Sequence, residues 1–247
     1  MIKKGILCLL FIICQCGFTQ QLNVAVAVDM PPFVYQTANN HFYGFDISMI
    51  SYICNKINRP CQFKPMPFKD IIDSVSKGET DVGVSSLTIN AERAQKVIFS
   101  DPYLPGYCQF MVSRDFNQPY SLDTLQNNKI GYLEGSLFTQ VLSSLGVTNS
   151  IVSFADERSL IEALNNQQIQ IVLVDEPTVD YWLVNGGQKF KTLGQPFEYG
   201  LGIAIAVRPN QPNLVQQINQ ALSDYLKSSE YREHLQHFIH NDLSISD

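Results

Sequence analysis

The sequence is poor in basic residues and in histidine. It has 17 lysine and arginine residues against 23 acidic residues, which gives a net charge of −6 at pH 7. An acidic surface repels phosphate groups, so we expect no nucleic acid and no anionic lipid surface as a partner. Three of the four histidines lie within residues 234–240, and none forms a metal-ligand pattern with the cysteines. We therefore predict no metal site and no cofactor.

The chain also lacks internal repeats, low-complexity segments and apolar runs of membrane-spanning length. Of its 247 residues, 45% are hydrophobic and 16% are charged. This composition is typical of a globular chain with one large core or two modest cores. No Ser-His-Asp or Cys-His arrangement is visible, which argues against nucleophilic catalysis.

The first 20 residues have the pattern of a secretory signal peptide. Lys3 and Lys4 precede an apolar run at residues 6–13, and small or polar residues follow it. The run is too short to span a bilayer, and a basic start is typical of a cleaved signal. A retained anchor helix and a lipoprotein are the alternatives, although neither Cys14 nor Cys16 follows a small residue. Cleavage leaves 15 basic against 23 acidic residues, a net charge of −8.

The rest of the chain alternates strands with helices, which predicts an α/β fold with mainly parallel sheets covered by helices. We predict strands at residues 22–28, 62–64, 81–85, 129–133, 151–154 and 169–174. We predict helices at residues 46–56, 68–77, 136–145, 158–165 and 178–184. The alternation restarts near residue 129, so two units of similar construction are expected.

The segment 81–103, DVGVSSLTINAERAQKVIFSDPY, places hydroxyl groups and an arginine where a strand gives way to a helix. Ser85, Ser86 and Thr88 follow the strand, an asparagine is a good N-cap, and Arg93 lies in the first helical turn. Free backbone N–H groups, hydroxyls and a guanidinium are the groups that bind a carboxylate. An ordinary strand-to-helix loop with a surface arginine fits the spacing equally well.

The same segment resembles the signature of bacterial periplasmic solute-binding proteins of family 3, which bind polar amino acids such as lysine, arginine, ornithine, histidine and glutamine. Six further motifs follow in the family's order: MPPF at 30–33, GFDISMI at 44–50, FKDIIDSVSKGETD at 68–81, GYLEGS at 131–136, VLVDEP at 172–177 and YGLGIAIAVRP at 199–209. The resemblance implies a two-lobed periplasmic binding protein fold of type II with a two-strand hinge. Lobe 1 would comprise residues 21–108 and 199–247, and lobe 2 residues 109–198.

The resemblance also implies a binding site for the α-carboxylate of a free L-amino acid. Arg93 is expected to pair with this carboxylate, with Thr88 beside it. From the other lobe, the backbone N–H groups at Ser136 and Leu137 are expected to contribute. The family usually has threonine where this chain has Leu137, so only the backbone donor carries over.

The α-ammonium group of the ligand is expected to pair with Asp175, together with Ser86 and Thr88. Asp175 ends the apolar run IVLV and stands opposite the arginine in the family pattern. The alternative is that Asp175 only caps the helix that begins with Pro177 near its start.

The side-chain pocket is implied less specifically by the resemblance. Met30 and Phe68 stand where relatives place aromatic residues that stack on the ligand, and Phe138 replaces a residue that is often polar. Core packing is the alternative for all three. Asp29 and Glu134 flank the region and are candidates to hold a cationic side chain, or are solvated surface acids. We expect arginine or another basic or polar amino acid as the ligand.

Three cysteines remain after the predicted signal. Cys54 lies near the end of a predicted helix and Cys61 opens the next strand. The lysine/arginine/ornithine binders carry a disulfide of this spacing, and the resemblance implies the same bridge here; two buried thiols are the alternative. Cys108 is expected to lie without a partner in a strand.

These observations predict a monomeric periplasmic protein of a Gram-negative bacterium that captures an amino acid by hinge closure and delivers it to an inner-membrane ABC permease. It is not expected to be an enzyme. The alternatives are a cyclohexadienyl dehydratase-like enzyme on the same scaffold and a ligand sensor for a signalling partner. A dehydratase needs a general acid, for which Glu134 and Glu176 are candidates.

Overall fold

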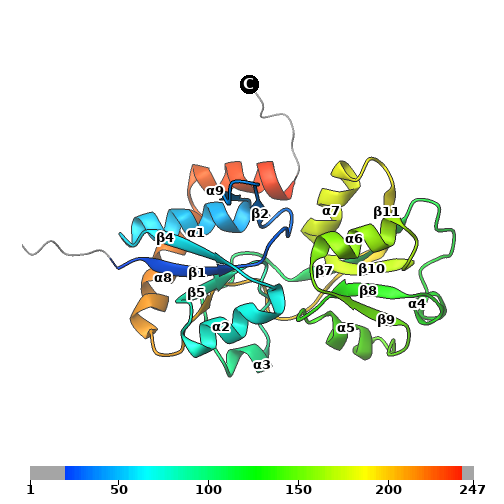
Figure 1. Cartoon of the computed structure of the whole chain (residues 1–247), viewed down its shortest axis with the longest axis horizontal. Coiled ribbons are helices and arrows are strands. Elements are labelled where there is room, and N and C mark those ends of the chain that lie inside the picture. Colours follow the sequence, from blue (N-terminus) through cyan, green and yellow to red (C-terminus); the bar gives the residue numbers. More distant parts are fainter. Residues whose placement is uncertain (1–19, 241–247) are drawn as a thin grey trace, which may run out of the picture.

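The structure, a computed structural model, describes residues 20–240, and these form two lobes that lie side by side (Figure 1). Each lobe is built on one five-stranded sheet with helices on both faces. Apart from Gln20, the predicted signal peptide lies outside the described residues. None of the helices within residues 20–240 is long and apolar enough to cross a bilayer.

The first lobe contains the sheet with the strand order β4-β1-β5-β12-β6. Its strands are β1 (Leu22–Val26), β4 (Cys61–Pro65), β5 (Val82–Val84), β6 (Ile98–Phe99) and β12 (Ala206–Val207). Helix α1 (Phe45–Lys56) lies on one side of this sheet and α2 (Ile71–Lys77) on the other (Figure 1). The lobe also contains the hairpin β2 (Tyr35–Gln36) and β3 (Phe42–Tyr43), the turn η1 (Phe68–Asp70), and the helices α3 (Ala91–Ala94), α8 (Pro212–Tyr225), α9 (Ser229–His234) and η2 (Leu235–Ile239).

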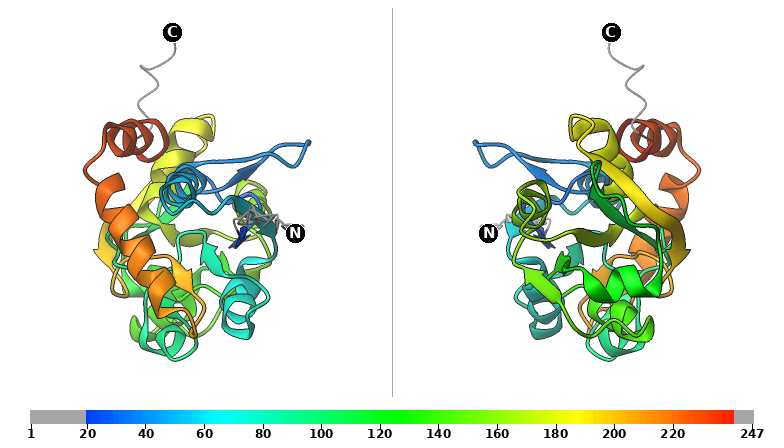
Figure 2. Two further views of the ribbon diagram at one scale, coloured as in Figure 1. Left: turned by 90° about the vertical axis from the view of Figure 1, so that its left-hand side faces the viewer. Right: turned by 90° about the vertical axis from the view of Figure 1, so that its right-hand side faces the viewer.

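The second lobe contains the sheet with the strand order β11-β7-β10-β8-β9. Its strands are β7 (Tyr107–Ser113), β8 (Ile130–Leu133), β9 (Ile151–Phe154), β10 (Ile171–Asp175) and β11 (Phe190–Glu198). Its helices are α4 (Leu122–Asn127), α5 (Phe138–Ser144), α6 (Glu157–Asn165) and α7 (Glu176–Asn185). The end-on views show the yellow α7 near the red C-terminal helices of the first lobe (Figure 2).

The central strand β10 shows why its sequence is a continuous apolar run. Ile171 and Leu173 point into the core beneath α5, whereas Val172 and Val174 point into the core beneath α6 and α7. Both faces of the strand are therefore buried, and alternation between polar and apolar residues is lost. This buried strand ends at Asp175, at the edge of the sheet that faces the first lobe.

Both sheets are mixed: each combines the predicted parallel pairs with antiparallel ones. β1 pairs in parallel with β4 and β5, and β8 pairs in parallel with β9 and β10, but β7, β11 and β12 pair antiparallel with their neighbours. The antiparallel strands adjoin the two segments, residues 100–106 and 199–205, through which the chain passes between the sheets. A chain that crosses and returns must run in opposite directions on its two passes. Strand β7 belongs to the second sheet from Tyr107 on, two residues before the predicted lobe limit.

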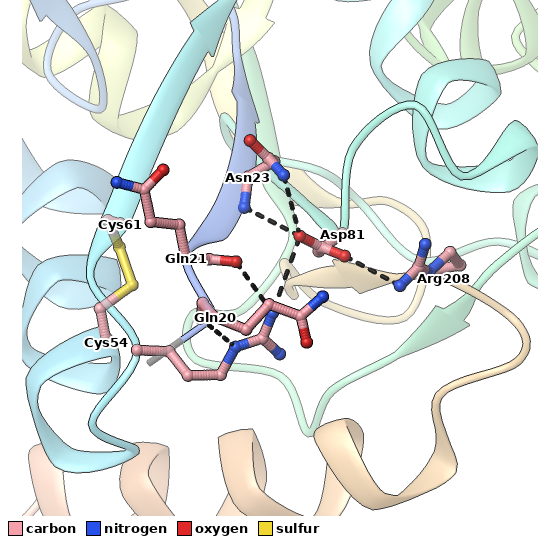
Figure 3. A network of polar contacts seen from close by, with 8 residues as sticks. Gln20, Gln21, Asn23, Cys54, Cys61, Asp81 and Arg208 are labelled. Atoms are coloured by element: carbon pink, nitrogen blue, oxygen red, sulfur yellow. Dashed lines mark hydrogen bonds and ion pairs between the residues drawn. A yellow bond between two sulfur atoms is a disulfide. The ribbon is translucent and has the colours of Figure 1, made fainter. Parts of the chain in front are cut away.

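The start of β1 is held by a buried ion pair around Asp81 (Figure 3). Asp81 accepts a hydrogen bond from the backbone N–H of Asn23 at 2.9 Å and pairs with Arg208 at 2.9 Å. Arg59 lies 3.8 Å from the same carboxylate and donates to the carbonyl oxygens of residues 20 and 21, both at 3.0 Å. These contacts join the first strand to the residues that precede β5 and follow β12.

The predicted disulfide is confirmed: Cys54, near the end of α1, is joined to Cys61 at the start of β4 (Figure 3). Cys108 lies buried in β7 and has no disulfide partner within residues 20–240. We expect reduction of the bridge, or the double substitution Cys54→Ser with Cys61→Ser, to lower the free energy of unfolding by about 2 to 3 kcal/mol. Urea unfolding of the oxidised and reduced protein measures this difference.

Ligand affinity is expected to stay unchanged in the reduced protein, because the bridge closes a loop at the far end of α1 from the candidate site. A reduced protein that has lost affinity while its fold is retained would contradict this separation.

Candidate functional site

Arg93 lies buried between the lobes, with only 7% of its surface exposed. Asn90 caps α3 by accepting a hydrogen bond from the Arg93 backbone N–H at 2.8 Å, which fixes where the side chain starts. Nη1 donates to the carbonyl oxygen of Thr88 at 2.8 Å, and Nη2 donates to that of Gly135 in the second lobe at 2.9 Å. Burial lowers the pKa of the guanidinium, which places a weakly solvated cation in the cleft.

The Arg93 guanidinium lies over the ring of Phe68, 5.7 Å from its centroid. Phe68 is the first residue of the turn η1 and directly follows Pro67, which occupies the N-cap position. An aromatic face attracts a cation by its quadrupole, so Phe68 helps to hold the guanidinium in place. The structure therefore places the predicted stacking residue against Arg93 as well as in the core.

Asp175 faces the first lobe from the end of β10 and is 5% exposed. Its carboxylate accepts hydrogen bonds from the hydroxyl of Ser86 at 3.1 Å and from the hydroxyl of Tyr199. Tyr199 in turn accepts a hydrogen bond from the Thr88 hydroxyl at 2.8 Å. Burial raises the pKa of Asp175 to about 6, although these two hydroxyls and the Arg93 charge favour the ionised form.

The loop that carries Ser85 and Ser86 is held by hydrogen bonds to other residues of the first lobe. The Ser85 hydroxyl accepts a hydrogen bond from the Ala27 backbone N–H at 2.8 Å. The Ser86 backbone N–H donates to Asp46 at 2.8 Å, and Tyr103 donates to the same carboxylate at 2.8 Å. Ser85 thus supports the loop, while the Ser86 hydroxyl points across to the second lobe.

The second lobe contributes the loop between β8 and α5. Gly135, with a φ of +83°, comes so close to Lys69 that an added Cβ would lie 2.5 Å from its Cα. The Ser136 backbone N–H donates to the Leu133 carbonyl oxygen within the turn, at 3.1 Å. The close approach of Gly135 to Lys69 brings this loop onto Arg93.

The two residues after Ser136 point into the core of the second lobe rather than toward the first lobe. Leu137 and Phe138 are buried in the core of the second lobe, where the Phe138 ring packs against Tyr199 with 5.2 Å between the centroids. Phe138 does not line the cavity described next, and its contacts are those of a core residue.

A cavity of about 480 Å³ lies between the lobes beside Phe68. Met30 and Phe68 line it from the first lobe, and Leu133 and Glu157 line it from the second. Most of the lining is apolar, and Met30 is 4% exposed. A mostly apolar cavity of this size between two lobes is typical of a site for a small molecule.

The two acids expected to hold a cationic side chain are each paired with a cation of this chain. Asp29 accepts a hydrogen bond from Arg158 at 2.6 Å, and Glu134 pairs with Lys69 at 3.1 Å. Both pairs cross from one lobe to the other, and both are partly exposed to solvent. Neither Asp29 nor Glu134 lines the cavity.

Three residues of the site were missed in the sequence. Tyr199 stands in a hinge segment with no periodic pattern, although it opens the family motif YGLGIAIAVRP. Asp46 looked like an ordinary acid in the first turn of a helix, and burial raises its pKa to about 7. Glu157 likewise starts a helix, where acids are common. Only the burial seen in the structure distinguishes these residues from surface groups.

Comparison with known proteins agrees with this architecture. The arginine-binding periplasmic protein of Mannheimia haemolytica is 27% identical over 236 residues, which cover 94% of this chain and 96% of the relative. The structure of an arginine 3rd transport system periplasmic binding protein from Legionella pneumophila superposes with a TM-score of 0.82 at 26% identity and covers 89% of this chain and 99% of that chain. An ancestral arginine-binding protein bound to glutamine gives a TM-score of 0.80 at 28% identity, with 88% and 97% covered.

These neighbours confirm the two-lobed type II fold. The sequence model of one family, described as bacterial extracellular solute-binding proteins, family 3, matches residues 22–241. The matched segment takes in both sheets and every residue of the candidate site. The chain therefore belongs to the bacterial extracellular solute-binding proteins of family 3.

Proposed function

We propose that this protein captures a free L-amino acid, arginine or another basic or polar one, between its lobes and delivers it to an ABC permease. One observation supports this most directly: a buried arginine in the first lobe and a buried aspartate in the second lie in one cleft, with hydroxyl groups beside them. A zwitterion carries both countercharges at fixed spacing. Arg93 would take its carboxylate and Asp175 its ammonium group.

The geometry favours a carboxylate at Arg93. Two N–H groups of the guanidinium donate to the carbonyl oxygens of Thr88 and Gly135 at 2.8 and 2.9 Å, so the planar fork is held in one orientation between the lobes. A carboxylate supplies two acceptors together with a negative charge, which neutral carbonyl groups lack, so it is the stronger partner for a guanidinium held in this way.

The buried carboxylate of Asp175 favours an ammonium ligand. Burial raises its pKa despite the opposing effect of the Arg93 charge, and a ligand ammonium in contact with the carboxylate would offset the cost of burial. The Ser86 and Tyr199 hydroxyls would then hold the ionised carboxylate in position. Since the two countercharges come from opposite lobes, the ligand binds the closed arrangement better than any open one and shifts the hinge toward closure.

The named relatives support a basic or polar side chain. The Mannheimia haemolytica relative and the ancestral protein are both called arginine-binding, and an ancestral arginine-binding protein has been solved with arginine and with glutamine. We place the protein in the periplasm of a Gram-negative bacterium, after removal of residues 1–20, and expect it to act there as a monomer. The permease would receive the ligand when the hinge opens.

The proposal predicts selective stabilisation by L-amino acids. In a thermal-shift screen of residues 21–247, at least one basic or polar L-amino acid should raise the free energy of unfolding by about 2.7 kcal/mol at 100 times its Kd. D-Arginine is the control, because it cannot satisfy Arg93, Asp175 and the cavity together. The ligand recovered afterwards should be chemically unchanged. Absence of a shift with every L-amino acid, or turnover of arogenate or prephenate, would refute the proposal.

A further inference from the structure

Glu157 lines the interlobe cavity from a buried position, whereas its neighbour Asp156, which also lines the cavity, is partly exposed. Glu157 lies at the first residue of α6 and is 3% exposed. The Trp182 indole N–H donates to its Oε1 at 3.2 Å, which fixes the side chain in one orientation. The start of a helix favours a negative charge and offsets part of the cost of burying this carboxylate.

No lysine, arginine or histidine within residues 20–240 lies close enough to form an ion pair with Glu157. Asp29 and Glu134 differ in this respect, because each already has a cation of this chain. Burial raises the pKa of Glu157 well above its usual value, and the charge of Asp175 adds to the effect. A buried carboxylate without a cation is costly, and a cationic ligand group would remove that cost.

The cavity that Glu157 lines adjoins the candidate α-amino-acid site through Phe68. Phe68, which lies under Arg93, is at one part of its lining, and Glu157 is at another. Most of the remaining lining is apolar, including Met30 and Leu133 from opposite lobes. A long side chain with an aliphatic stem and a charged end matches a mostly apolar cavity that has a buried carboxylate in its lining.

We propose that Glu157 binds the cationic end of the ligand side chain and selects a guanidinium or ammonium group over a neutral group of the same size. This inference rests on the proposed function, because it needs an amino acid held by Arg93 and Asp175. Asp29 and Glu134 then serve as bridges between the closed lobes. The acid that sets specificity is one that the sequence motifs did not mark.

The test compares L-arginine with L-citrulline, which has nearly the same shape but a neutral end. By calorimetry, the unsubstituted protein should bind L-arginine at least tenfold more tightly than L-citrulline. Glu157→Gln should lower the affinity for L-arginine tenfold or more and leave the affinity for L-citrulline within threefold. Glu162→Gln, on the exposed side of the same helix, is the matched control and should change neither.

The outcomes separate this inference from the proposed function. Equal affinities of the unsubstituted protein for L-arginine and L-citrulline, or equal losses in Glu157→Gln, would overturn the role of Glu157 while the amino acid site stands. Absence of binding to every L-amino acid would overturn both. If Glu157→Gln does not fold, the comparison of the two ligands in the unsubstituted protein still decides, and Glu157→Asp should keep the preference for L-arginine.

Discussion

Arg93→Ala should lower the affinity for L-arginine by about 30-fold to about 4,000-fold, equivalent to about 2 to 5 kcal/mol, and leave the protein folded. The ligand carboxylate would lose its bidentate partner in a cleft from which water is largely excluded. The fold should survive because α3 is capped through the Arg93 backbone N–H, which the substitution keeps. Calorimetry gives the affinity, and circular dichroism checks the fold.

Two further variants make this result specific to Arg93. Arg93→Lys keeps the charge but not the planar fork, so it should recover only part of the affinity. Arg232→Ala removes an exposed arginine of α9 and should bind as the unsubstituted protein does. Near-normal affinity in Arg93→Ala would show that the carboxylate is bound elsewhere.

Asp175→Asn should have opposite effects on binding and on stability. Loss of the ammonium partner should weaken L-arginine binding by about 2 to 5 kcal/mol. The unliganded protein should become more stable at pH 7.5, by about 1 to 3 kcal/mol, because a carboxylate whose pKa is raised to about 6 costs free energy when it is ionised in the fold. Calorimetry and urea unfolding measure the two effects.

The pH dependence follows from the same group. The folded protein holds the Asp175 proton more tightly than the unfolded chain, so this group lowers stability as pH rises from about 4 to about 6. Binding needs the ionised form, so the affinity of the unsubstituted protein should fall below about pH 6, at most tenfold per pH unit. In Asp175→Asn this fall should be absent. An identical pH profile in both proteins would assign the titration to another group, such as Asp46.

The elements that the sequence predicted well are those with a local signal. The strands and helices of the two alternating runs follow from apolar periodicity and from breakers such as Pro60, and Cys61 begins β4 as expected. The antiparallel strands β6 and β12 have only two residues each, too few for any periodicity to be visible. Their pairing depends on residues more than 100 positions apart, which a local pattern does not contain.

The residues of the candidate site also fall into those with a local sequence signal and those whose contacts only the folded structure shows. Arg93, Thr88 and Asp175 were predicted because hydroxyls, an arginine and an acid at strand ends form a local pattern that a family shares, and the structure brings all three together between the lobes. Asp29 and Glu134 were expected to serve the ligand because acids near a cleft look alike in a sequence. Their cations, Arg158 and Lys69, come from the opposite lobes, and only the folded arrangement shows that pairing.

Because the chain crosses between the sheets twice, the two sheets acquire their last strands at different times during synthesis. Tyr107 and Glu198 are paired neighbours at the two ends of one continuous segment, so the second sheet has all its strands as soon as β11 leaves the ribosome. The first sheet does not, because β6 is joined to it only through β12, at residues 206–207. The half of the protein that is translated first is thus finished last. A nascent chain that stalls after residue 198 would present an unpaired edge of β5, the strand that leads into Ser85 and Ser86.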